Sequence, residues 1–151
     1  MSFEDVVTLL GHAFGLELKV VQDTTVFEVE SEDGGSKVQV LLQDVVERNL
    51  VLMSADLGES PSDGGERLLR TMLEANNLFE GTAGATLALD AATGRFRLQK
   101  CESPDEFSND VKAKVESFIE TALFWSRAIV DSRTSDEEPE APSGGFQMLQ
   151  V

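Results

Sequence analysis

The feature that most constrains the fold is the run of residues 50–57, Leu-Val-Leu-Met-Ser-Ala-Asp-Leu, which is apolar on both faces when written as a β-strand. Such a strand needs cover on both sides, so it is predicted to be central in a sheet or to form an interface. The segment before it alternates with period two through Val38, Val40 and Leu42, as a strand with one buried face does. The sequence therefore predicts a sheet with residues 50–57 in its interior.

Two hairpins are predicted beside these strands. Residues 16–30 alternate with a tight turn at Asp23 and Thr24, and residues 86–100 alternate around the turn Ala-Ala-Thr-Gly at 91–94. The alternating positions are Leu16, Leu18 and Val20, then Thr25, Phe27 and Val29, and in the second hairpin Leu87, Leu89, Phe96 and Leu98. Antiparallel pairing is expected in both.

Three helices complete the predicted fold. They span residues 3–14, with Ser2 as N-cap, about 65–79, and about 104–130, where Ser103 and Pro104 form a strong start signal. The fold class is therefore α+β, a twisted antiparallel sheet covered by helices in the order α-β-β-β-β-α-β-β-α. The first helix is apolar over two adjacent stripes, which fits either burial on two sides or a partner-binding face.

The charge of the chain disfavours some classes of partner, and its composition predicts two regions. The chain has 28 Asp and Glu against 12 Lys and Arg, a net charge of −16. Such acidity disfavours nucleic acid and anionic membrane surfaces. We expect a folded domain over residues 1–130 and an acidic, disordered tail over 131–151, dispensable for folding, because the tail has few apolar residues to bury. The alternative is that its apolar end, Phe146 to Val151, docks on the folded domain.

The cellular setting is predicted from the same sequence. Cys101 is the only cysteine, which fits a reducing compartment, and the N-terminus has acidic residues where a signal peptide has basic ones. No apolar run approaches the length of a membrane span. We therefore expect a cytoplasmic protein that does not insert into membranes.

Catalysis has little support in the sequence. His12 is the only histidine, so a histidine-based metal site is excluded and a Cys101–His12 nucleophile pair is improbable. Residues 56–67 resemble a calcium loop only superficially, because Arg67 stands where a bidentate Glu is needed. We predict no enzyme activity, no metal and no cofactor.

The order of elements resembles the class I type III secretion chaperones, the family of the Tir chaperone. The residues that carry the resemblance are Leu9-Leu10-Gly11 in the first helix, the hairpin at 16–29, the strand at 50–52 and the middle helix at 68–79. The resemblance implies a bacterial chaperone that binds the N-terminal region of a secreted effector in extended form and keeps it soluble and competent for secretion. It implies strand addition to the chaperone sheet and apolar pockets for cargo side chains.

The resemblance also implies two binding surfaces. The dimer interface of a homodimer would use the middle helix, with Leu69, Met72, Leu73 and Leu78. The cargo surface would use the first helix and the nearby sheet edge, with Phe3, Val7, Leu10 and Leu18, and Val40 on the next strand.

Other interpretations of the sequence remain open. The chain could be an acidic adaptor or a toxin-neutralising immunity protein that binds a basic partner, or an acidic mimic of nucleic acid. An enzyme using carboxylates would need a polar pocket where a chaperone needs an apolar groove. Salt separates these classes, because charge-driven binding weakens steeply with ionic strength and apolar binding persists.

Overall fold

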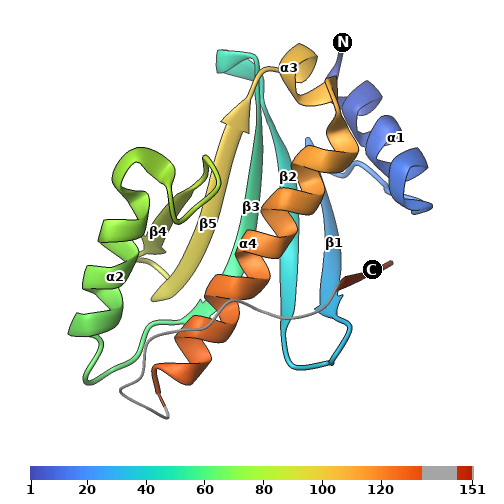
Figure 1. Ribbon diagram of the computed structural model, residues 1–151. Helices are drawn as coiled ribbons and strands as arrows, with labels where there is room; N and C mark the ends of the chain where they lie inside the picture. Colours follow the sequence, from blue (N-terminus) through green and yellow to red (C-terminus); the bar gives the residue numbers. More distant parts are fainter. Residues whose placement is uncertain (134–145, 151) are drawn as a thin grey trace.

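A computed structural model of the protein describes residues 1–133 and 146–150, and its core is a six-stranded antiparallel sheet with the strand order β4-β5-β3-β2-β1-β6 (Figure 1). The strands are β1 Thr24–Ser31, β2 Lys37–Val45, β3 Leu50–Glu59, β4 Thr86–Asp90, β5 Arg95–Glu102 and β6 Phe146–Leu149. The α-helices are α1 Phe3–Phe14, α2 Glu66–Asn76, α3 Pro104–Ser108 and α4 Val111–Asp131, and the short 3-10 helices are η1 Val46–Arg48 and η2 Asn77–Phe79. The predicted α+β class is confirmed.

The predicted central strand is β3, which lies between β5 and β2. One face of β3 is buried under helices, and on the other face Ser54 is also buried, where it accepts a hydrogen bond from Arg97 Nη1 on β5 (3.1 Å). Leu50 and Leu52 are half-buried. β3 is therefore interior with respect to its neighbouring strands, with one face fully buried and the other carrying half-buried and buried side chains.

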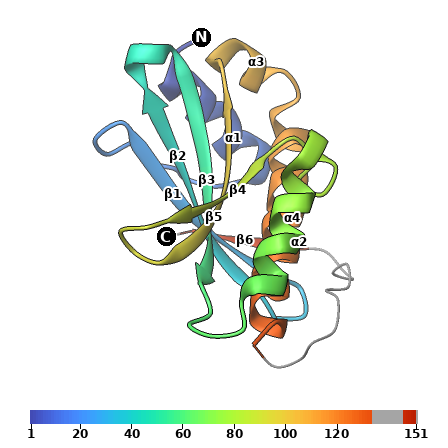
Figure 2. The same cartoon turned by 90° about the vertical axis from the view of Figure 1, so that its left-hand side faces the viewer.

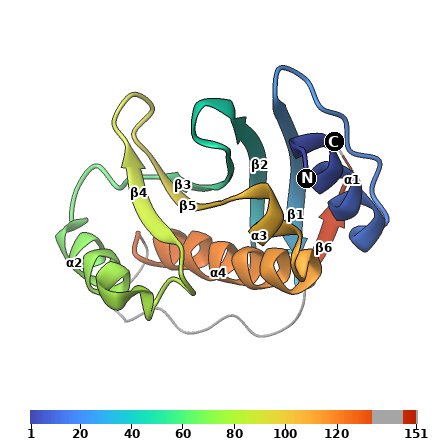
Figure 3. The same cartoon turned by 90° about the horizontal axis from the view of Figure 1, so that it is seen from above.

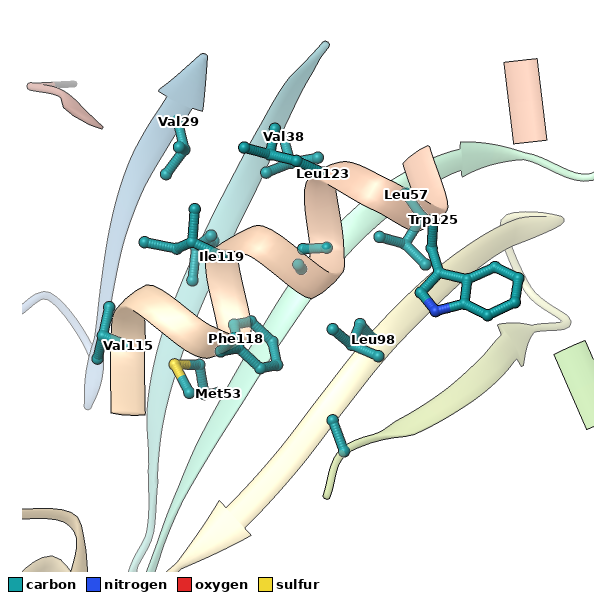
Figure 4. Close-up of a cluster of buried hydrophobic side chains, with 14 of the residues drawn as sticks. Val29, Val38, Met53, Leu57, Leu98, Val115, Phe118, Ile119, Leu123 and Trp125 are labelled. Atoms are coloured by element: carbon teal, nitrogen blue, oxygen red, sulfur yellow. The ribbon is translucent and has the colours of Figure 1, made fainter. Parts of the chain in front are cut away.

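Helix α4 covers one face of the sheet, running beneath the strands in Figure 3. Its buried side chains meet those of β1, β2, β3 and β5 in one continuous core (Figure 4). The residues labelled in that view are Val29, Val38, Met53, Leu57, Leu98, Val115, Phe118, Ile119, Leu123 and Trp125. Removing so much apolar surface from water is the main stabilising term of the fold.

Helix α1 has the boundaries that its sequence predicts. Ser2 and Asp5 form a capping box, in which the Ser2 amide donates to Asp5 Oδ2 (2.8 Å) and the Asp5 amide donates to Ser2 Oγ (3.2 Å). Gly15 ends the helix in the left-handed region at φ 66°. Gly11 allows the chain to fold back, because a Cβ there would lie 2.7 Å from the Leu16 carbonyl oxygen. The helix packs against both α3 and α4.

Two predicted elements differ from the structure. Residues 16–20 form no strand, although their side chains alternate between half-buried and exposed, so three strands and not four precede α2. The helix expected over 104–130 is two helices, because Asn109 is extended and Asp110 is left-handed at φ 57°. Short polar side chains such as Asp adopt the left-handed conformation at low cost, which allows the break at this position.

The last described residues form a strand within the region expected to be a disordered tail. Residues 146–149 are β6, which pairs antiparallel with β1, so the expectation of disorder does not hold for them. Residues 134–145 and 151 of that expected tail lie outside the described residues. None of the helices in the described part of the chain is both long enough and apolar enough to cross a membrane.

Candidate protein-binding surfaces

One exposed apolar surface lies on α2 and η2, and we call it the α2 face. Leu69 is 41% exposed, Leu73 71%, Leu78 76% and Phe79 52%. Figure 2, which views the molecule from the β4 side, shows α2 in front of α4. A depression of about 610 Å³ lies along the helix, lined by Leu69 and Leu73 with Glu66, Arg70, Glu74 and Asn77 around them. A contiguous apolar surface with a charged rim is typical of a protein interface.

Asn76 fixes α2 to the sheet. Its Nδ2 donates to the Leu87 carbonyl oxygen (3.0 Å), and its Oδ1 accepts from the Leu87 amide (2.8 Å). The side-chain amide therefore occupies both backbone groups of Leu87 in β4, as a neighbouring strand would. We call this pair the Asn76 clamp.

A second candidate surface lies at the opposite edge of the sheet, and we call it the β1 groove. It has a volume of about 420 Å³ and lies between β1 and the segment that follows α1. Its lining residues are Glu17, Leu18, Lys19, Val21, Thr24, Thr25, Val26 and Gln150. Val21 is 67% exposed, whereas Leu18 is half-buried against the core. Thr25 Oγ1 is buried and has no hydrogen-bond partner within the described residues.

β1, the strand that borders this groove, is fixed by its pairing with β2 and by contacts of its hairpin with α4. β1 pairs with β2 from residue 24 to residue 30, and the hairpin that joins them is attached to α4. Asp33 accepts hydrogen bonds from Ser31 Oγ (2.6 Å), Arg127 Nη2 (2.7 Å) and the Gly35 amide (2.8 Å). These three donors, Ser31 foremost, hold the pKa of the Asp33 carboxyl well below its ordinary value. The edge of β1 is therefore preformed.

The structure places most of the predicted cargo contacts in the core. Phe3, Val7, Leu10 and Val40 are at most 4% exposed. Helix α1 packs on α3 and α4, which buries one stripe together with Val6 of the second, while Leu9 of the second stripe is 39% exposed. Leu18 is the one predicted cargo residue that lines the β1 groove. In this conformation a partner cannot reach the other four side chains, so the cargo contacts proposed below do not include them.

Three of the four predicted dimer residues are exposed, Leu69 and Leu73 on α2 and Leu78 on η2. Met72 is the exception, because it is 4% exposed and points into the core. Phe79 and the half-exposed Leu89 of β4 were not predicted as contacts. Leu78 (φ 56°) and Phe79 (φ 58°) are left-handed, a departure from the helix that periodicity does not indicate.

No constellation for catalysis appears among the described residues. His12 on α1 and Cys101 on β5 are both exposed and share no hydrogen bond in that part of the chain. The described side chains include no group of three or more His, Cys, Asp or Glu placed to hold a metal ion. The two hollows described above are bounded largely by apolar atoms, as surfaces for protein side chains are.

Comparison with known proteins agrees with this geometry. A sequence model of the Tir chaperone protein (CesT) family matches residues 7–126, which is most of the chain. The chain belongs to this family. The match extends from α1 into α4, so it includes the α2 face and every lining residue of the β1 groove except Gln150. No curated protein matches it by sequence.

Solved structures share the fold of this CesT family member. A chain of the ExsC–ExsE complex has a TM-score of 0.62 at 19% identity, with 84% of this chain and 95% of that one covered. A chain of the HopA1–SchA chaperone–effector complex has a TM-score of 0.61 at 13% identity, covering 85% and 93%. A chain of the heterodimeric complex ExoU–SpcU from the type III secretion system of Pseudomonas aeruginosa has a TM-score of 0.58 at 22% identity, covering 83% and 94%.

Proposed function

We propose that this CesT family member is a type III secretion chaperone that binds the N-terminal region of a secreted effector in extended form. The observation that carries the proposal is the match to the Tir chaperone family over residues 7–126. The similar solved structures support it, since one is a chaperone–effector complex and another comes from a type III secretion system. The protein acts without catalysis or cofactor in the bacterial cytoplasm, keeping the effector soluble and competent for secretion.

The β1 side of the molecule is the proposed cargo surface. An extended chain gains backbone hydrogen bonds by adding to a sheet edge, and pockets for alternate side chains provide selectivity. The β1 groove supplies an apolar pocket, with the exposed Val21 and the half-buried Leu18 and Val26 beside the part of β1 that β6 does not pair with. The acidity of the chain favours a cargo segment in which apolar residues alternate with basic ones.

The α2 face is the proposed homodimer interface. It presents the exposed Leu69, Leu73, Leu78 and Phe79, and burying a large apolar side chain contributes about 1.5–3 kcal/mol of gross transfer energy. The charged rim of its depression includes Arg70, Glu66 and Glu74. A two-fold contact places the same patch opposite itself, so the bases and acids of two copies can pair across it.

Two exposed valines with nearly equal exposure test the cargo surface. Val21 in the β1 groove is 67% exposed, and Val46 in the turn between β2 and β3 is 68% exposed. The chain is co-expressed with the N-terminal segment of a candidate effector from the native host, and the captured complex is quantified after affinity purification. Val21→Asp should reduce capture at least about tenfold, whereas Val46→Asp should leave it unchanged.

Two results would refute parts of this proposal. Equal capture by both variants and the wild type would exclude the β1 groove as the cargo site. Circular dichroism must show that both variants fold, which their exposure predicts. Capture of a basic partner that is lost completely when salt rises from about 0.1 M to 1 M would instead favour an acidic adaptor or immunity protein, the second candidate that the net charge of −16 supports.

A further inference from the structure

The cargo-side edge of the sheet is occupied in this structure by the chain's own residues. β6 pairs antiparallel with β1, with Met148 opposite Val29 and Gln147 opposite Glu30. Phe146 and Met148 pack against the core, while Gln147 is exposed. Beyond β6, Gln150 lines the β1 groove, and its Nε2 donates to the Glu17 carbonyl oxygen (3.2 Å). Figure 3 shows β6 at the β1 end of the sheet, beside α1.

We propose that β6 is an exchangeable strand that fills the acceptor edge of β1 in the cargo-free chain and is displaced by a β-strand of the cargo. The inference rests on the proposed function only for the identity of the competing strand. An edge strand with unpaired backbone groups promotes aggregation, and pairing with a strand of the same chain protects it until a partner binds.

The acceptor edge does not depend on β6 for its shape. β1 spans eight residues and is paired along its other side with β2, while its hairpin is fixed to α4 through Asp33 and Arg127. Phe27 and Val29 are fully buried in the core below. Removal of β6 therefore exposes an ordered strand, and a new partner need not order it.

The present occupant leaves part of the site unused. β6 has four residues, which pair with residues 28–31 of β1, and its apolar side chains are only half-buried. No strand pairs with residues 25–27 on that side within the described part of the chain. A longer strand in the same direction would continue past residue 28 into the β1 groove. It would bury more apolar surface and form more backbone hydrogen bonds than β6 does, which favours exchange.

The register also indicates which residues the incoming strand carries. Positions opposite Val29 and Ser31 face the core, where β6 has Met148 and Phe146. Positions opposite Glu30 and Glu28 face the other side, where β6 has Gln147 and Leu149. Glu28 already binds Lys37 (2.9 Å), so Glu30 is the carboxylate better placed to receive a basic side chain. The preferred cargo strand is apolar toward the core and basic opposite Glu30.

The test uses a peptide copy of the internal strand, so it needs no known effector. A fluorescein-labelled peptide of residues 143–150, Ser-Gly-Gly-Phe-Gln-Met-Leu-Gln, is titrated with the full-length chain and followed by fluorescence anisotropy. Met148→Asp in the protein should tighten peptide binding at least about tenfold, because a covalently attached competitor has a high effective concentration and this change removes it. Gln147→Thr is the control at the neighbouring position and should bind as the wild type does, since this side chain is exposed and stays uncharged opposite Glu30.

A disulfide lock provides the opposite perturbation. Glu30→Cys with Gln147→Cys places two thiols on directly opposite residues, and Cys101→Ser removes the native thiol. The oxidised protein should bind no peptide, and reduction should restore binding to the wild-type level. A peptide with Gln147→Lys should bind Met148→Asp protein more tightly than the unchanged peptide at low salt, with the difference lost at high salt.

The outcomes separate this inference from the proposed function. Equal peptide binding by Met148→Asp and Gln147→Thr proteins, or binding unaffected by the lock, overturns the exchange. Failure of the two cysteines to oxidise overturns the pairing itself. If an effector segment is captured equally by locked and reduced protein, the effector does not use this edge and the inference fails while the chaperone function stands. If the peptide exchanges but no effector segment is captured by any form, the proposed function fails and the exchange stands.

Discussion

Leu9 and Leu10 on α1 offer a matched test of which surface of this helix is internal. Leu10 is 0% exposed in the core, whereas its neighbour Leu9 is 39% exposed. A buried Leu→Ala change removes about 2–5 kcal/mol, the sum of lost transfer energy and the cavity left behind. Leu10→Ala should therefore lower the melting temperature by about 4–20 °C, at about 2–4 °C per kcal/mol for a chain of this size. Leu9→Ala should cost less than about 1 kcal/mol.

The assay is urea unfolding at fixed protein concentration, followed by circular dichroism and by the fluorescence of Trp125, which is 2% exposed in the core. Both probes should give one transition, with a lowered midpoint and an unchanged slope in Leu10→Ala. Equal losses in the two variants would mean that α1 is rotated relative to this structure. A stable Leu10→Ala variant that no longer captures cargo would mean that α1 itself contacts the cargo.

Three further changes test other parts of the structure. Leu73→Asp on the α2 face should convert a dimer of about twice 16.4 kDa to a monomer in sedimentation analysis, and a wild-type mass of one chain would exclude the proposed interface. Burial raises the pKa of Glu102, but hydrogen bonds from Lys114 and Lys100 outweigh burial, so the net pKa lies below the ordinary 4.5. The contacts of Glu102 with the two lysines therefore stabilise the fold above pH 4.5, and this contribution is lost as the pH falls through the lowered pKa. The urea midpoint should therefore fall less on acidification in Lys114→Met than in the wild type, and parallel pH profiles would contradict this assignment. Asn76→Ala should cost about 1–3 kcal/mol of unfolding free energy, because it leaves two backbone groups of β4 without partners, and a loss below about 0.5 kcal/mol would show that water replaces the clamp.

The sequence predicted the elements in which local pattern and tertiary burial agree. The two apolar faces of residues 50–57 indicated an interior strand, and β3 has neighbours on both sides. The N-cap residue Ser2 indicated the start of α1 at Phe3. In each case the constraint is contained within a few adjacent residues.

The alternation of residues 16–20 predicted a strand that the structure lacks. Leu18 and Val20 pack against the core while Glu17 and Lys19 are exposed, so the pattern correctly reports burial in an extended segment. Hydrogen-bond pairing is a separate property that period-two alternation does not establish. The break at Asn109 and Asp110 was missed for a related reason, because the apolar stripe continues on both sides of it.

The binding surfaces were harder to predict than the fold. The width of the apolar surface on α1 fitted either a groove or a core helix, and only the positions of α3 and α4 decide between them. Met72 differs from Leu69 and Leu73 by its direction on one helix, which depends on where the sheet lies. The pairing of β6 with β1 joins residues more than a hundred positions apart, so no local pattern indicates it.

The Asn76 clamp has a consequence for how copies of this protein behave at high concentration. Head-to-tail growth of a filament would join the β1 end of one sheet to the β4 end of the next, and such a contact repeats without closing. Asn76 has already bound the amide and carbonyl of Leu87, so the β4 end offers an incoming strand a capped terminus. One pair of outward backbone groups on β4 is therefore closed to an incoming strand, which disfavours the joining of sheets end to end between copies of this chaperone.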